Sequence, residues 1–235
     1  MENYKCQDVR FADIQMLRYR LDGFDKLSLN SKKLIYCLSE ATLWGRDITF
    51  DQFGKYNLKI RKTLEAVFLS YKGNRQDKEF LALTEYLNRV WFSNGIYHHY
   101  GCEKFVPDFS EQFLRNAVEN CNKELLPLGK GETAEQLIDE LSKPVFDPSF
   151  MPKRVNMDEG VDVVKESACN FYDGVTQKDV EDFYKKQSAN DDDEPVSHGL
   201  NTTLVKSDGA LTEHVWKIGG LYGAAIEHIV FWLNK

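Results

Sequence analysis

The sequence predicts an α+β fold that is mainly α-helical, in which a helical cluster precedes a few strands of a small β-core. Apolar residues recur with helical spacing over most of the chain. Two β-prone runs flank an Asp-Gly pair, which is typical of a hairpin near residues 200–215. The helical part is expected over about residues 28–142 and a mixed α/β part over about residues 155–235.

The overall composition is that of an ordinary globular protein. The chain has 235 residues, of which 42% are hydrophobic and 29% are charged, and it is long enough to bury a core. A formal net charge of -7 and a pI of about 5.3 argue against broad electrostatic contact with nucleic acid or with an anionic membrane. No apolar run reaches the roughly 18 residues of a membrane span.

The cysteines indicate a reducing compartment. They are widely separated and never form a C-x-x-C pair, so we predict free thiols rather than a disulfide framework or a zinc knuckle. The first residues contain no apolar segment typical of a signal peptide, and the expected location is therefore the cytoplasm. The five cysteines are Cys6, Cys37, Cys102, Cys121 and Cys169.

The first elements are a strand and three helices. Branched and aromatic side chains within residues 14–21 predict a short strand, which the Asp22-Gly23 turn signal ends. Amphipathic spacing then predicts helices over about residues 31–44, about residues 60–71 and about residues 80–91. Because the links between these helices are short, we expect them to pack as a cluster.

Two further helices and an irregular stretch follow. Apolar spacing predicts a helix around residues 113–121. Thr133 and Gln136 have the spacing of a capping box, which predicts the start of another short helix. Three prolines then predict extended or irregular backbone over residues 143–153.

The last part of the chain contains a helix on each side of the hairpin. Thr176 and Asp179 have capping spacing and predict the start of the first of these helices. The acidic run at residues 190–195 lacks the glycine and glutamate of a calcium loop, so we interpret it as a solvated loop. Residues 218–233 have the apolar stripe of a final helix, and because the stripe reaches Lys235 without a helix-ending residue, we expect the polypeptide to continue.

The sequence contains no complete catalytic motif of a common kind. The H-E-x-x-H metal motif, the phosphate-binding loop and the nucleophile elbow are all missing. His98 or His99 with Cys102 has a plausible local spacing for zinc, but one pair is not a site. We therefore predict no catalytic residue and no metal ligand within this chain.

The most unusual stretch is the aromatic segment, residues 91–107, which is dense in rings and amides. Its candidate substrate-binding residues are Asn94, Tyr97, His98 and His99. Such groups either bind a ligand or satisfy one another, and the second interpretation is favoured because buried polar groups are normally hydrogen-bonded.

The aromatic segment resembles the N-terminal signature of dipeptidyl-peptidase III, a family of zinc-dependent exopeptidases. The resemblance rests on Ser93-Asn94, Tyr97, Gly101 and Lys104-Phe105-Val106-Pro107. Other blocks also resemble the family. All the blocks occur in the same order as in the family, and together they cover most of the chain. They are Leu38-Ser39-Glu40-Ala41 through Trp44-Gly45-Arg46, Asn170-Phe171-Tyr172 through Thr176, Leu200 through Lys206, and Val215 through Gly223.

The resemblance implies that residues 1–235 are the N-terminal region, most of one lobe, of a two-lobed enzyme that releases dipeptides from peptide N-termini. Family members bind zinc through an H-E-x-x-G-H-type motif and a later Glu, which this chain lacks. Zinc is thus expected only in a full-length member. The expected partners are the zinc-bearing remainder of the same polypeptide and short peptides, which align as an added strand on the β-core.

Two alternatives stay open. One is a stand-alone, non-catalytic helical module that binds peptides or proteins through the aromatic segment without zinc. The other is a structural or interaction protein derived from the peptidase by truncation.

Overall fold

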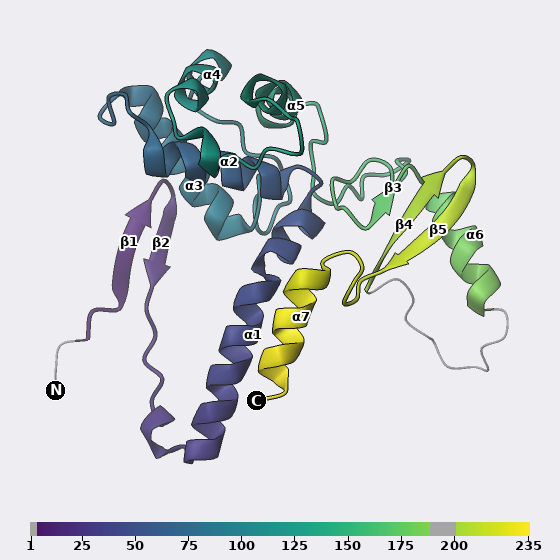
Figure 1. Ribbon diagram of the computed structural model, residues 1–235, viewed down its shortest axis with the longest axis horizontal. Coiled ribbons are helices and arrows are strands. Elements are labelled where there is room, and N and C mark those ends of the chain that lie inside the picture. The colour runs from purple at the N-terminus through teal and green to yellow at the C-terminus, as the bar shows by residue number, and fades with distance from the viewer. Residues whose placement is uncertain (1–3, 189–200) are drawn as a thin grey trace.

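The computed structural model describes residues 4–188 and 201–235 and shows a mainly helical α+β fold, which confirms the predicted class (Figure 1). The acidic run at residues 190–195 lies outside the described residues. The helices are α1 (Leu29–Phe53), α2 (Asn57–Ser70), α3 (Lys78–Ser93), α4 (Glu111–Glu119), α5 (Ala134–Phe146), α6 (Gln177–Ser188) and α7 (Gly223–Leu233). Two sheets are formed by β1 (Gln7–Phe11) with β2 (Ile14–Leu17), and by β3 (Tyr172–Asp173), β4 (Thr202–Ser207) and β5 (Ala210–Val215).

The main core lies in the helical cluster, α2 to α5, which occupies the upper part of Figure 1. Its largest fully buried side chains come from the apolar faces that the helical spacing indicated, and each contributes roughly 1.5–3 kcal/mol on burial. They include Leu64, Val67, Leu83, Leu87, Leu114, Leu137 and Leu141.

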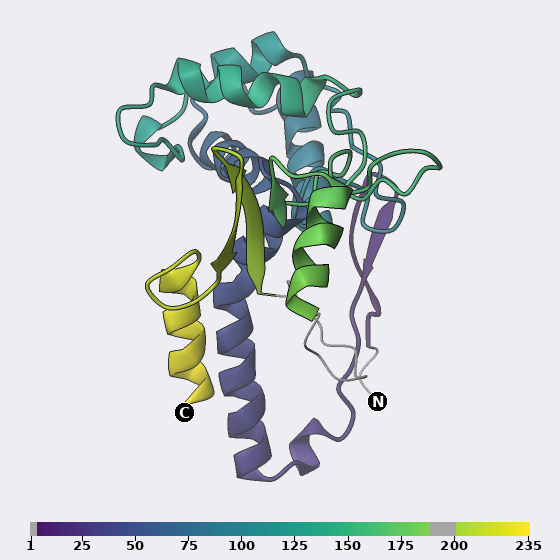
Figure 2. The same cartoon turned by 90° about the vertical axis from the view of Figure 1, so that its right-hand side faces the viewer.

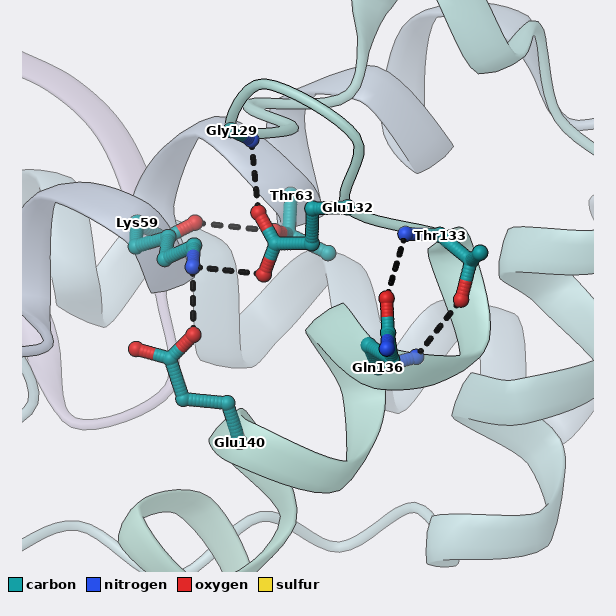
Figure 3. A network of polar contacts seen from close by, with 7 residues as sticks. All are labelled: Lys59, Thr63, Gly129, Glu132, Thr133, Gln136 and Glu140. Carbon is teal, nitrogen blue, oxygen red and sulfur yellow. Dashed lines mark hydrogen bonds and ion pairs between the residues drawn. The ribbon is translucent and has the colours of Figure 1, made fainter.

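A polar network fastens α5 to α2 on the outside of this core (Figure 3). Lys59 of α2 donates to Glu132 at 2.8 Å and also to Glu140 of α5. The second oxygen of Glu132 accepts from the Gly129 backbone N–H at 2.6 Å. This N–H and the Lys59 ammonium lower the pKa of Glu132 below its ordinary value, so the network keeps its charge.

The capping box that opens α5 is confirmed, but the predicted end of this helix is wrong. Thr133 accepts from the Gln136 N–H at 3.2 Å, and Gln136 accepts from the Thr133 N–H at 2.9 Å (Figure 3). The helix continues through Pro144 to Phe146 instead of ending near residue 142. Proline removes one helical hydrogen bond. Here Pro144 and Val145 are both buried, and this packing offsets the loss.

The hairpin near residues 200–215 is confirmed as β4 and β5, with a sheet order of β3-β4-β5. Asp208 and Gly209 have φ values of 51° and 80°, the positive values that a two-residue hairpin turn requires. β3 runs parallel to β4, with Tyr172 paired to Leu204. Because β5 has a sheet neighbour on one side only, its other edge is unpaired within the described residues.

Helix α6 packs beside this sheet through polar contacts. Lys206 of β4 donates to Asp179 at 3.1 Å, and the Tyr184 hydroxyl donates to Glu213 of β5 at 2.8 Å. The predicted cap is confirmed, since the Asp179 N–H donates to the Thr176 hydroxyl oxygen at 3.2 Å.

Helices α1 and α7 lie side by side and antiparallel below the helical cluster (Figures 1 and 2). Trp44 stacks on His228 with ring centroids 3.8 Å apart. Both helices keep large apolar side chains exposed. Three of them, Leu34, Leu38 and Leu233, line one groove, and we call these side chains the α1–α7 apolar face.

Two predicted boundaries at the chain ends differ from the structure. The final helix begins at Gly223 and not at residue 218, because Gly219 and Tyr222 adopt left-handed backbone with φ values of 79° and 58°. The strand expected within residues 14–21 is β2, and it pairs with β1, which the pattern did not predict. Within residues 4–188 and 201–235, each helix is too short or too polar to cross a lipid bilayer.

Candidate functional site

The aromatic segment folds back on itself directly after α3. Asn94 adopts left-handed backbone with a φ of 54° and caps the helix, while Gly95 follows with a φ of 148°. The Phe105 N–H then donates to the Ile96 carbonyl at 2.8 Å, which closes the segment into a loop. Asn94 therefore turns the backbone at the end of α3.

Asn57, the first residue of α2, holds the start of this loop. Its side-chain oxygen accepts from the Ile96 N–H at 3.2 Å, and the residue is only 1% exposed. A Cβ atom on Gly95 would lie 2.2 Å from the Asn57 side-chain nitrogen, and one on Gly54 would lie 2.8 Å away. Two glycines thus make room for one buried amide.

Tyr97 is buried inside the fold. Its ring is 3% exposed, and its hydroxyl donates to the Met151 carbonyl at 3.0 Å. Burial raises the pKa of Tyr97 well above its ordinary value, so the phenol stays protonated. This geometry supports the interpretation that Tyr97 satisfies an internal contact.

His98 and His99 lie nearer the surface and stack on each other at 4.5 Å between ring centroids. The Nδ1 atom of His98 accepts from the backbone N–H of Gly101 at 3.1 Å. The Nδ1 atom of His99 is buried and has no hydrogen-bond partner among the described residues. Burial and the neighbouring His98 lower the pKa of His99.

The β1–β2 hairpin reaches this loop. Asp13 pairs with Arg89 of α3 at 2.8 Å, and the ring of Phe11 lies 6.2 Å from that of Phe92. The Asp13 charge acts to raise the pKa of His99, against the larger effect of burial. The two histidines are therefore part of a packed corner between α3 and the first sheet.

Lys104 connects the loop to the end of α5. Its ammonium donates to the Asp147 carbonyl at 3.0 Å and to the Phe150 carbonyl. Burial lowers the pKa of Lys104 from its ordinary 10.5 to about 8.

The lowered pKa of Lys104 predicts a pH dependence of stability. Between pH values of about 8 and 10.5 the unfolded chain keeps a proton that folded Lys104 has lost, so this residue makes the free energy of unfolding rise with pH in that window. Urea unfolding at several pH values measures this free energy. Subtracting the value for Lys104→Met from that of the wild type removes the contribution of all other titrating groups. A wild-type-minus-variant difference that stays flat or falls across the window contradicts the prediction.

Arg154 lies between two cysteines from distant parts of the chain. Its backbone N–H donates to the Cys102 carbonyl at 2.8 Å, and its carbonyl accepts from the Cys169 N–H at 3.2 Å. Its guanidinium donates to the Cys102 sulfur at 3.5 Å and lies 4.4 Å from the centre of the Phe53 ring. Burial raises the pKa of the Cys169 thiol to about 11, and all five cysteines are unpaired.

The structure brings the candidates together in one loop but gives them different surroundings. Asn94 and Tyr97 have internal roles in the backbone turn and the core, whereas His98 and His99 are partly exposed. The spacing of residues in the sequence did not indicate that Arg154 and Cys169 lie beside this loop, because their contacts join segments far apart in the chain. A group of three or more side chains suited to a metal ion is not found in the part of the chain that the structure describes.

No protein-family model matches this chain, and a search of curated proteins finds no significant match.

Proposed function

We propose that this chain is the N-terminal lobe segment of a zinc-dependent, dipeptidyl-peptidase III-like exopeptidase, in which residues outside it bind the zinc. The proposal rests on the ordered blocks that resemble the family. The described residues support it in one respect: blocks far apart in the sequence contact one another. Tyr172, from one block, pairs with Leu204 of the next, and the Trp216 indole N–H donates to the Thr203 hydroxyl at 3.1 Å.

Helix α1, which carries the first block, contacts the same unit beyond that block. Asn170 donates from its backbone N–H to the Gln52 carbonyl of α1 at 2.9 Å. Asp51 accepts from the Tyr222 hydroxyl, and burial together with this contact raises the pKa of Tyr222. In the proposed enzyme these contacts fix the sheet against α1. The edge of β5 that is unpaired within residues 4–188 and 201–235 is available to an extended peptide. We place the enzyme in the cytoplasm.

Two measurements test the proposal. The coding sequence beyond Lys235 is expected to contain an in-frame H-E-x-x-G-H-type motif. The chain itself, supplied with zinc, is expected to release no dipeptide from a dipeptidyl-arylamide and to retain no stoichiometric zinc after dialysis. A stop codon directly after Lys235, or turnover by this chain, contradicts the proposal.

A non-catalytic protein-binding module is the second candidate, and the α1–α7 apolar face favours it. Exposed apolar side chains gathered on one surface mark interaction sites. A groove of about 310 Å³ between the two helices is lined by Leu34, Leu38 and Trp232. The aromatic segment is a poorer candidate for this role, because Tyr97 is buried within it. A stop codon directly after Lys235 would favour this module.

A further inference from the structure

A cavity of about 320 Å³ lies where the helical cluster meets the sheet. Lys55 and Tyr56, between α1 and α2, line one side of it, and β3 with Gly174 lines the other. Ligand pockets commonly lie at such junctions and start at about 300 Å³, so this cavity suits a ligand of only a few groups.

The backbone of Tyr172 offers a peptide-like donor and acceptor at this cavity. The Leu204 N–H of β4 donates to the Phe171 carbonyl at 3.0 Å. Alternation along an extended strand then directs the N–H and C=O of Tyr172 away from β4. Tyr172, Lys55 and Tyr56 all line the cavity, so this N–H and this C=O lie on the edge of β3 that borders it. Neither has a hydrogen-bond partner among residues 4–188 and 201–235.

Opposite charges stand together at the mouth of the cavity. The Lys55 ammonium and an Asp173 carboxylate oxygen are 3.3 Å apart, and their side chains are 50% and 54% exposed. An exposed pair of this kind contributes little to stability, about 0–1 kcal/mol, and exchanges its partners readily. The pair can therefore open to accept a ligand that carries both charges.

The rest of the lining is mixed, because the polar residues Lys165, Ser167, Cys169 and Thr176 lie beside aliphatic ones. Met151, Val164, Ala168 and Val175 provide aliphatic surface, and the Tyr172 ring is half-buried beside them. Burial raises the pKa of the Tyr172 phenol, which therefore remains a neutral hydrogen-bond donor.

We propose that this cavity binds a free dipeptide, a small zwitterion with one amide group. Its carboxylate pairs with Lys55, its ammonium pairs with Asp173, and its amide pairs with the backbone of Tyr172. The aliphatic lining receives one apolar side chain. A free dipeptide is also the product class of the proposed peptidase, but binding here requires neither zinc nor turnover. The inference therefore stands or fails separately from that function.

Calorimetric titration of the whole chain tests the site, with alanyl-leucine as the probe. N-acetyl-alanyl-leucine and alanyl-leucine amide each lack one terminal charge and leave one protein charge unpaired, so both are expected to bind about tenfold or more weakly. The tetrapeptide Ala-Ala-Ala-Leu exceeds the cavity and is expected to bind more weakly as well.

Protein variants locate the ligand. Lys55→Met and Asp173→Asn are each expected to weaken alanyl-leucine binding about tenfold while the melting temperature stays nearly unchanged. Lys123→Met is the matched control, because Lys123 forms a comparable exposed pair with Glu119 at 2.9 Å. It is expected to bind the probe like the wild type.

Several outcomes overturn the proposal. These are no measurable heat with alanyl-leucine, equal affinity for the blocked dipeptides, and unchanged binding by both Lys55→Met and Asp173→Asn. A loss of binding in the Lys123→Met control also overturns it.

Discussion

Gly95→Ala is expected to lower the free energy of unfolding by about 2–6 kcal/mol. The φ of 148° lies in a region that side chains other than glycine rarely adopt, which costs of order 1–3 kcal/mol. The added methyl would also lie 2.2 Å from the Asn57 side chain. That amide is almost fully buried and hydrogen-bonded to Ile96, so it cannot swing aside without losing its contact. The clash costs about 1–3 kcal/mol more.

Gly131→Ala is the matched control for this substitution. Gly131 also has a positive φ, 78°, but its Cβ would meet no atom within 4 Å. Only the backbone cost remains, about 1 kcal/mol. Urea unfolding followed by circular dichroism measures both variants. If Gly95→Ala destabilises no more than Gly131→Ala does, the contact with Asn57 does not constrain the loop as described.

Tyr97→Ala is expected to lower the free energy of unfolding by about 3–5 kcal/mol, the usual cost of removing a large buried aromatic side chain. Tyr97→Phe keeps the ring and loses only the hydrogen bond to Met151, which costs about 1 kcal/mol. Tyr100→Ala removes an exposed ring of the same segment, 85% accessible, and is expected to change stability by less than about 0.5 kcal/mol.

Thermal melts and peptide titrations of these three variants separate a structural role from a binding role. The packed position of Tyr97 predicts that, in the full-length enzyme proposed above, Tyr97→Phe binds peptides like the wild type. A Tyr97→Phe variant with unchanged melting temperature and weakened peptide binding would instead make Tyr97 a substrate contact.

Local patterns in the sequence predicted most of the helices and the hairpin. The cap at Thr133 and Gln136 and the turn at Asp208-Gly209 are made by residues at most three apart, so the spacing alone carries the information. Pro144 and Tyr222 were misjudged for different reasons. At Pro144, favourable packing outweighed the rule that proline ends a helix. Near Tyr222, the apolar residues already have helical spacing upstream of Gly223, where the helix begins.

The sequence identified the aromatic segment as a candidate site, but it did not reveal the contacts that hold this segment in place. The bond from Ile96 to Asn57 spans 39 residues, and that from Tyr97 to Met151 spans 54. Periodicity does not report which distant segments meet. For the same reason, the junction of Lys55 with Asp173, 118 residues later, had no signal in the sequence.

Association through the α1–α7 apolar face should depend on temperature. Water around Leu34, Leu38 and Leu233 is released when another surface covers them, and this gives a negative change in heat capacity. The driving force for that association is largely entropic near room temperature and weakens on cooling. Any assembly held together mainly by this face should therefore loosen in the cold.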